Sequence, residues 1–203
     1  MERILDSFRP LNGGKSKVFL QFKLNLSDQD VLVIYATTVI QNIKVSLLTP
    51  DEWERLRQIR IRALSANPEA FGAKLTEVIS QPKEEWLKLY KKEDYLVAST
   101  AGIDVGMLYI EVLKGDHGAT CWIGGCWTDP DYRGIGVMRS LFNYIDKHAI
   151  QKGWQRQGLG VWADNLVAIN SYKSLGFTFT GEKMLGNDSG KFFQHMVRDV
   201  PKS

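Results

Sequence analysis

Cysteine and histidine are scarce in this sequence, with two cysteines and three histidines among 203 residues. Cys121 and Cys126 lie five positions apart in an extended run, so about 16 Å separates them along a strand and they cannot bond to each other. None of the histidines stands at zinc-like spacing from a cysteine. We therefore expect two free thiols and no metal.

Long apolar runs and a large excess of one charge are also missing. The longest apolar stretch, residues 31–40, is too short to span a bilayer, and the first ten residues contain no apolar run typical of a signal peptide. The formal charge of +3 arises from 26 basic and 23 acidic residues, an excess too small for a nucleic-acid surface. We expect a soluble cytoplasmic protein with no membrane or nucleic-acid partner.

What is present suits one globular domain with an appendage, because 44% of the residues are hydrophobic. Alternating apolar residues over 17–26, followed by a second strand over 31–39, predict a leader and a β-hairpin within residues 1–40. We interpret this part as a sheet-edge extension or a non-native leader rather than a regulatory module. Residues 41–203 are predicted to form the main domain.

The order of predicted elements in the main domain is typical of an α+β (α/β) fold with a mixed sheet flanked by helices. Strands are expected at 42–48, 95–100, 105–113, 119–128, 158–163, 177–182 and 192–200, and helices from 50 to about 64, at 81–90, 136–152 and 166–175. The helix at 136–152 connects two strands that should run parallel. On the first helix, arginines 55, 57, 60 and 62 are expected to face solvent.

The stretch TDPDYRGIGVMRS, residues 128–140, carries the strongest chemical signal. A glycine-rich turn between a strand and a helix presents backbone N–H groups at the positive end of the helix dipole, which suits phosphate. The P-loop pattern is absent, and a dinucleotide turn would need glycine where Arg139 stands. A nucleotide-binding regulatory domain is therefore disfavoured.

A third phosphate-binding pattern fits better. Residues Arg133 to Met138, preceded by WTDPDY, resemble the R/Q-x-x-G-x-G/A motif of the GNAT acetyltransferases, with Met138 replacing the final small residue. Downstream, WADNLVAINSYKSLGF (162–177) is similar to that family's N-x-x-A-x-x-x-Y-x-x-x-G-F element. Upstream, RIRALSANPEAFGA resembles the first-helix region of small-molecule members, so the resemblance covers about residues 42–199.

The resemblance implies a GNAT fold and a site for acetyl-CoA as cosubstrate. It implies that a strand bulge, for which Gly124-Gly125 is the candidate, opens a slot for the pantetheine arm. Tyr172 would be the general acid that protonates the departing CoA thiolate, although packing alone could explain it. The implied cofactor-binding residues are Trp127, Thr128, Arg133, Gly134, Ile135, Gly136, Val137, Met138, Arg139, Asn165 and Tyr172, and Asn165 could also be a helix N-cap.

The implied reaction is direct attack of an amine on the thioester, with both substrates bound together. The implied acceptor is the amine of a small molecule, an amino acid or a protein N-terminus, and a homodimer is left open. Segments NPEAFGA and LGNDSGKFF are expected to line the acceptor site. The base is undecided among Glu111, Glu77 and a water relay, since ATCWIGGCW lacks the glutamate common in the family.

Two further expectations concern departures from the family pattern. The missing glutamate and Met138 keep open an alternative, a CoA-binding GNAT-like module without transferase activity. Helical periodicity groups Met138 with Leu141, Phe142 and Ile145. We therefore expect the Met138 side chain to lie in the core and only its backbone N–H to face the pyrophosphate.

Overall fold

The computed structural model describes residues 42–186 and 190–200. The predicted leader and hairpin of residues 1–40 lie outside the described residues. Within these described ranges, seven strands form one sheet: β1 (Lys44–Leu47), β2 (Glu93–Thr100), β3 (Ile103–Val112), β4 (Cys121–Thr128), β5 (Arg156–Trp162), β6 (Thr178–Leu185) and β7 (Phe192–Asp199). The α-helices are α1 (Trp53–Ala66), α2 (Leu75–Ser80), α3 (Lys83–Leu89), α4 (Val137–Lys152) and α5 (Leu166–Ser174).

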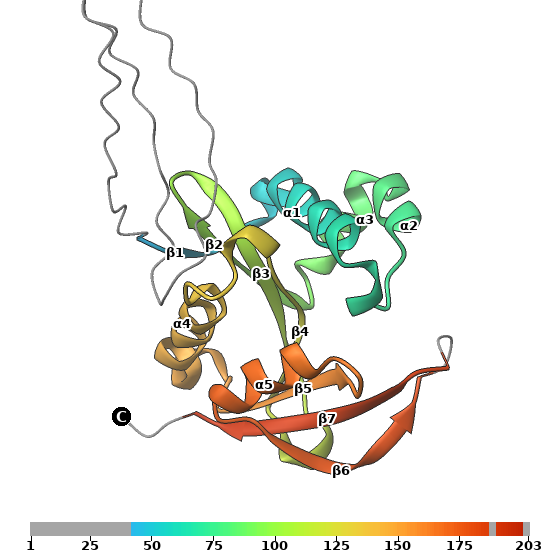
Figure 1. The fold of residues 1–203 in the computed structure, drawn as a ribbon. Coiled ribbons are helices and arrows are strands. Elements are labelled where there is room, and N and C mark those ends of the chain that lie inside the picture. Colours follow the sequence, from blue (N-terminus) through green and yellow to red (C-terminus); the bar gives the residue numbers. More distant parts are fainter. Residues whose placement is uncertain (1–41, 187–189, 201–203) are drawn as a thin grey trace, which may run out of the picture.

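The sheet has the strand order β1-β2-β3-β4-β5-β7-β6. Strands β1 to β4 form an antiparallel meander. Strands β4 and β5 run parallel, because α4 carries the chain back to the end of the sheet at which β4 starts. Figure 1 shows α1 to α3 on one side of β2 and β3 and α4 on the other. The mixed sheet flanked by helices and the parallel β4–β5 pair are confirmed.

Two hydrophobic clusters cover the two faces of this sheet. One includes Leu141 and Phe142 of α4 and Trp154, all fully buried. The other includes Leu56 of α1 and Trp86 of α3. The burial of apolar surface on both sides therefore holds the helices against the strands.

Local sequence signals account for the start of α1. Pro50 opens a short 3₁₀ turn before the helix, and the Glu52 carboxylate accepts a hydrogen bond of 3.1 Å from the Thr49 backbone N–H. The short helix α2 was not predicted from sequence, where residues 67–80 contain no extended apolar stripe. Within the described ranges, no helix has the length and apolar content needed to cross a membrane.

Candidate active site

The parallel strands β4 and β5 separate after a short region of pairing. They pair over Cys121–Ile123 and Gln157–Leu159, and the register between β3 and β4 then shifts. Gly125, within the shifted segment, has φ +62°, a conformation that favours glycine. The predicted bulge at Gly124-Gly125 is confirmed, and it bends β4 away from its parallel neighbour.

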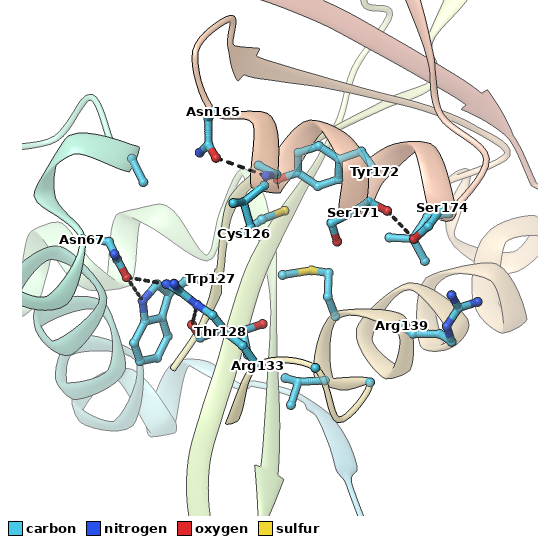
Figure 2. Close-up of a pocket in the computed structure, with 18 of the residues that line it drawn as sticks. Asn67, Cys126, Trp127, Thr128, Arg133, Arg139, Asn165, Ser171, Tyr172 and Ser174 are labelled. Atoms are coloured by element: carbon cyan, nitrogen blue, oxygen red, sulfur yellow. Dashed lines mark hydrogen bonds between the residues drawn. The ribbon is translucent and has the colours of Figure 1, made fainter. Parts of the chain in front are cut away.

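A cavity of about 620 Å³ lies between the end of β4, the start of α4, α5 and the segment after α1 (Figure 2). Most of the residues implied by sequence line it: Trp127, Thr128, Arg133, Gly134, Gly136, Val137, Met138, Arg139, Asn165 and Tyr172. Ile135 is not among the lining residues, because its side chain packs against the core beneath α4. The glycine turn and the Asn165–Tyr172 helix therefore meet around one space.

The glycine turn presents backbone donors to this cavity. Gly134 and Gly136 have φ values of +81° and +93°, which turn the chain sharply into α4. The first helical hydrogen bond is donated by Ser140 to the Gly136 carbonyl at 2.9 Å, so the N–H groups of residues 137–139 precede it. With the helix dipole, they make the N-terminus of α4 suited to an anion.

The Arg133 guanidinium is held at the wall of the cavity. It donates to the side-chain oxygen of Asn67 at 2.7 Å and to the Thr128 carbonyl at 3.2 Å. The Asn67 oxygen also accepts from the Trp127 indole N–H at 3.2 Å (Figure 2). Asn67 therefore connects the end of α1 to β4, a long-range role that its position in NPEAFGA does not reveal.

Helix α5 supplies a cap and a tyrosine. Asn165 accepts a hydrogen bond of 3.1 Å from the Ala168 backbone N–H, so it caps α5 and also lines the cavity. Tyr172 is buried and packs against Phe142 and Phe177. Both roles considered for Asn165, ligand contact and N-cap, are compatible with this position.

The Tyr172 hydroxyl and the Cys126 thiol lie next to each other at the cavity wall and interact electrostatically. Burial raises the pKa of Tyr172 well above its ordinary value, and the nearby thiol raises it further. Burial also raises the pKa of Cys126 to about 11, so both groups are neutral near pH 7. A protonated hydroxyl and a thiol are thus neighbours at the cavity wall. Sequence reasoning named Cys126 only as a buried thiol.

Glu69 is the carboxylate that lines the described part of the cavity, together with Asn67 and Ala70 from the same segment. The base candidates Glu77 and Glu111 are not lining residues. The prediction that NPEAFGA contributes to the site therefore agrees with the cavity. The other predicted acceptor segment, LGNDSGKFF, contains residues 187–189, which are outside the described residues.

Metal-binding side chains do not gather at this site. Over residues 42–186 and 190–200, no group of three or more His, Cys, Asp or Glu side chains is placed to hold an ion. Cys121 and Cys126 are both free thiols.

The Met138 side chain packs against the core cluster as expected, but it also lines the cavity, which was not expected. Val137 is buried at 1% exposure, whereas Met138 is only partly buried and lines the cavity. Val137 and Met138 both stand at helical spacing from Leu141, so periodicity alone does not distinguish them. Val137 packs against Gly106 of β3 and is almost completely buried, whereas Met138 is less buried, and both residues contribute to the cavity wall.

We therefore expect different effects from two truncations. Val137→Ala should lower the free energy of unfolding by about 2 kcal/mol, as for other buried large-to-small changes, and should weaken acetyl-CoA binding less than Met138→Ala does, because Val137 is 1% exposed. Met138→Ala should cost less stability and raise the Kd for acetyl-CoA several-fold, because it removes part of the cavity wall. Denaturant unfolding and calorimetric titration measure both effects, and the reverse result would assign Met138 to the core alone.

A mixed sheet that opens between two parallel strands, beside a glycine-rich helix N-terminus, defines a domain suited to an extended ligand that carries phosphate. The model of the acetyltransferase (GNAT) family matches residues 53–177, more than half of the chain. The chain therefore belongs to the GNAT acetyltransferase family, as the two sequence motifs predict.

Curated relatives are similar over part of their length. Acetyltransferase SG1711 of Sodalis glossinidius is 32% identical over 91 residues, which cover 45% of this chain and 61% of the relative. Mycothiol acetyltransferase of Thermobispora bispora is 29% identical over 123 residues, which cover 59% of this chain and 41% of the relative. The chain thus aligns with less than two thirds of each of these relatives.

Solved structures show the same fold at low sequence identity. A GNAT acetyltransferase of Streptococcus pneumoniae superposes with a TM-score of 0.65 at 16% identity, covering 79% of this chain and all of that one. Spermidine N-acetyltransferase of Vibrio cholerae, solved with CoA and spermine, superposes with a TM-score of 0.59 at 16% identity. The superposition covers 78% of this chain and 95% of the Vibrio cholerae chain.

Proposed function

We propose that this protein is an N-acetyltransferase that transfers the acetyl group of acetyl-CoA to an amine by direct attack in a ternary complex. The observation that carries the proposal is the cavity that joins the glycine turn before α4 to Tyr172 of α5. A CoA-binding neighbour of the same fold supports it. The two free thiols suit a reducing compartment such as the cytoplasm.

The cosubstrate would lie with its pyrophosphate against the backbone N–H groups of residues 134–139. Its pantetheine arm would follow β4 at Trp127 and Thr128, with Asn165 on the opposite side. Backbone N–H groups near Trp127 would stabilise the negative charge that develops on the thioester oxygen. Binding energy from these contacts would hold the thioester in place for attack, so positioning supplies much of the catalysis.

Tyr172 would protonate the CoA sulfur as the thioester breaks. Its raised pKa keeps the hydroxyl protonated at neutral pH, as a general acid requires. In the structure the hydroxyl lies next to the thiol of Cys126. In the ternary complex the CoA sulfur would lie within reach of this hydroxyl and accept its proton.

Thiol release across a panel of amines tests this function. The panel contains small amines, amino acids and peptides with free N-termini, each mixed with acetyl-CoA and the protein. We expect release above background for a subset, with an N-acetyl product seen by mass spectrometry. Binding of acetyl-CoA with a flat response to every amine would instead favour a CoA-binding module, an alternative consistent with the absence of a carboxylate on β4.

A further inference from the structure

Arg60 differs from the other arginines of α1. Arg55, Arg57 and Arg62 donate hydrogen bonds to carboxylates or backbone carbonyls. Arg60 donates none to any described residue, and its Nη1 is fully shielded from solvent. The prediction that these arginines form one solvated face is therefore wrong.

The Arg60 guanidinium lies beside the β4 bulge at Gly125 and over the ring of Phe71. Its central carbon is 4.9 Å from the centre of the Phe71 ring. Its Nη1 would lie 3.2 Å from a Cβ added at Gly125, in the bulge of β4. Phe71 follows Ala70 and Gly125 precedes Cys126, and both of those neighbours line the cavity. The guanidinium thus contacts two residues, Phe71 and Gly125, that are each the sequence neighbour of a cavity-lining residue.

The paired glycines of β4 make room for this arrangement. A Cβ at Gly124 would lie 2.3 Å from the Tyr109 hydroxyl, and a Cβ at Gly125 would lie 3.0 Å from the Tyr109 ring. Tyr109 therefore crosses over β4 in the space that a side chain at position 124 would take. Arg60 and Tyr109 together cover the bulge on the α1 face of the sheet.

No described carboxylate neutralises Arg60 directly. The tyrosines 95 and 109 and Glu93 are the titratable groups that face it, from β2 and β3. The Glu93 carboxylate accepts a hydrogen bond from the Tyr95 hydroxyl. Within the described ranges it makes no ion pair with Arg60 inside 4.0 Å.

Arg60 nevertheless stays charged. Burial lowers its pKa, but the ordinary value for arginine is so high that the guanidinium remains a cation near pH 7. A shielded cation without a hydrogen-bonded counter-ion destabilises a fold. A ligand that supplies the counter-ion would offset that cost.

We infer that Arg60 binds a carboxylate of the acceptor, so that the acceptor is an amino acid or another small molecule with a carboxylate close to its amine. A guanidinium can hold a carboxylate through two parallel hydrogen bonds. A polyamine would instead bring a second cation toward Arg60, which Coulomb repulsion disfavours. This inference rests on the proposed function, because it assumes that the amine reaches the thioester at the β4 bulge.

The test compares common L-α-amino acids with their α-carboxamides, which keep the amine and side chain but lack the carboxylate. For the amino acid that is the best acceptor, the KM should be about tenfold or more below the KM of its α-carboxamide. A difference of this size is expected from one charge-assisted hydrogen bond. Arg60→Met should abolish this difference, and Arg60→Lys should keep part of it. Arg57→Met, on the same helix, is the matched control and should keep the wild-type preference.

Melting temperatures and acetylation assays distinguish a failure of this inference from a failure to fold and from a failure of the proposed function. Arg60→Met should melt at or above the wild-type temperature, because it removes a partly buried cation whose shielded Nη1 has no hydrogen-bond partner among the described residues. If the wild type uses acid and amide equally, the inference is wrong and the acetyltransferase proposal stands. If no amine is acetylated, the proposed function fails. Calorimetric titration of both probes into the CoA-loaded protein then decides the inference, with tighter binding of the acid expected and equal or no binding overturning it.

Discussion

Tyr172→Phe should lower kcat for amine acetylation by about 10²- to 10⁴-fold, the range expected when a general acid is lost. The phenylalanine ring keeps the contacts with Phe142 and Phe177, so the fold should be retained. The Kd for acetyl-CoA should change little, because the hydroxyl acts on the sulfur only as the thioester breaks. Steady-state kinetics and calorimetric titration on the same preparation measure the two quantities.

Tyr144→Phe is the matched control. Tyr144 lies on α4, stacks on His148 and does not line the cavity, so loss of its hydroxyl should leave kcat unchanged. A Tyr172→Phe variant with wild-type kcat would mean that Tyr172 has only a packing role. An equal fall in both variants would indicate a general effect on folding.

Gly136→Ala should raise the Kd for acetyl-CoA by about tenfold. Gly136 is the residue before α4 and has φ +93°, where an alanine costs about 1–2 kcal/mol. No atom lies within 4 Å of the added Cβ, so the effect comes from backbone conformation and not from a clash. Relaxation of the turn would misalign the N–H groups that we assign to the pyrophosphate. Calorimetric titration measures the change.

The other end of the same helix provides the control. Gly153 follows α4 with φ +78°, and a Cβ there meets only ordinary contact with Val112 at 3.8 Å. Gly153→Ala should lose a similar amount of stability and keep the wild-type Kd. If both variants weaken binding equally, the glycine turn has no special part in holding the cosubstrate.

The parts of the fold that local patterns encode could be predicted from the sequence. A strand, an amphipathic helix and a second strand imply a parallel pair, and paired glycines inside a strand mark a bulge. The short helix α2 could not be predicted, since its six residues bury only Val78 and give no extended periodicity. Its position depends on packing against α1.

The candidate site was predictable where one segment contains the motif, as in the glycine turn. The side-chain contacts were not, because they join distant segments. Asn67 accepts a hydrogen bond from Arg133, and Tyr172 lies next to Cys126. Arg60 shows the same limit. An amphipathic pattern identifies the buried stripe of α1. It does not show which flanking arginine packs beside the β4 bulge, because that depends on the space left by glycines far along the chain.

Calorimetric titration of the wild-type protein with acetyl-CoA tests the central claim most directly. The cavity, the glycine turn and Tyr172 all acquire their proposed roles through this one ligand. We predict saturable binding at one site per chain, weakened by Gly136→Ala and retained by Tyr172→Phe. Absence of binding by correctly folded protein would contradict both the acetyltransferase and the CoA-binding module.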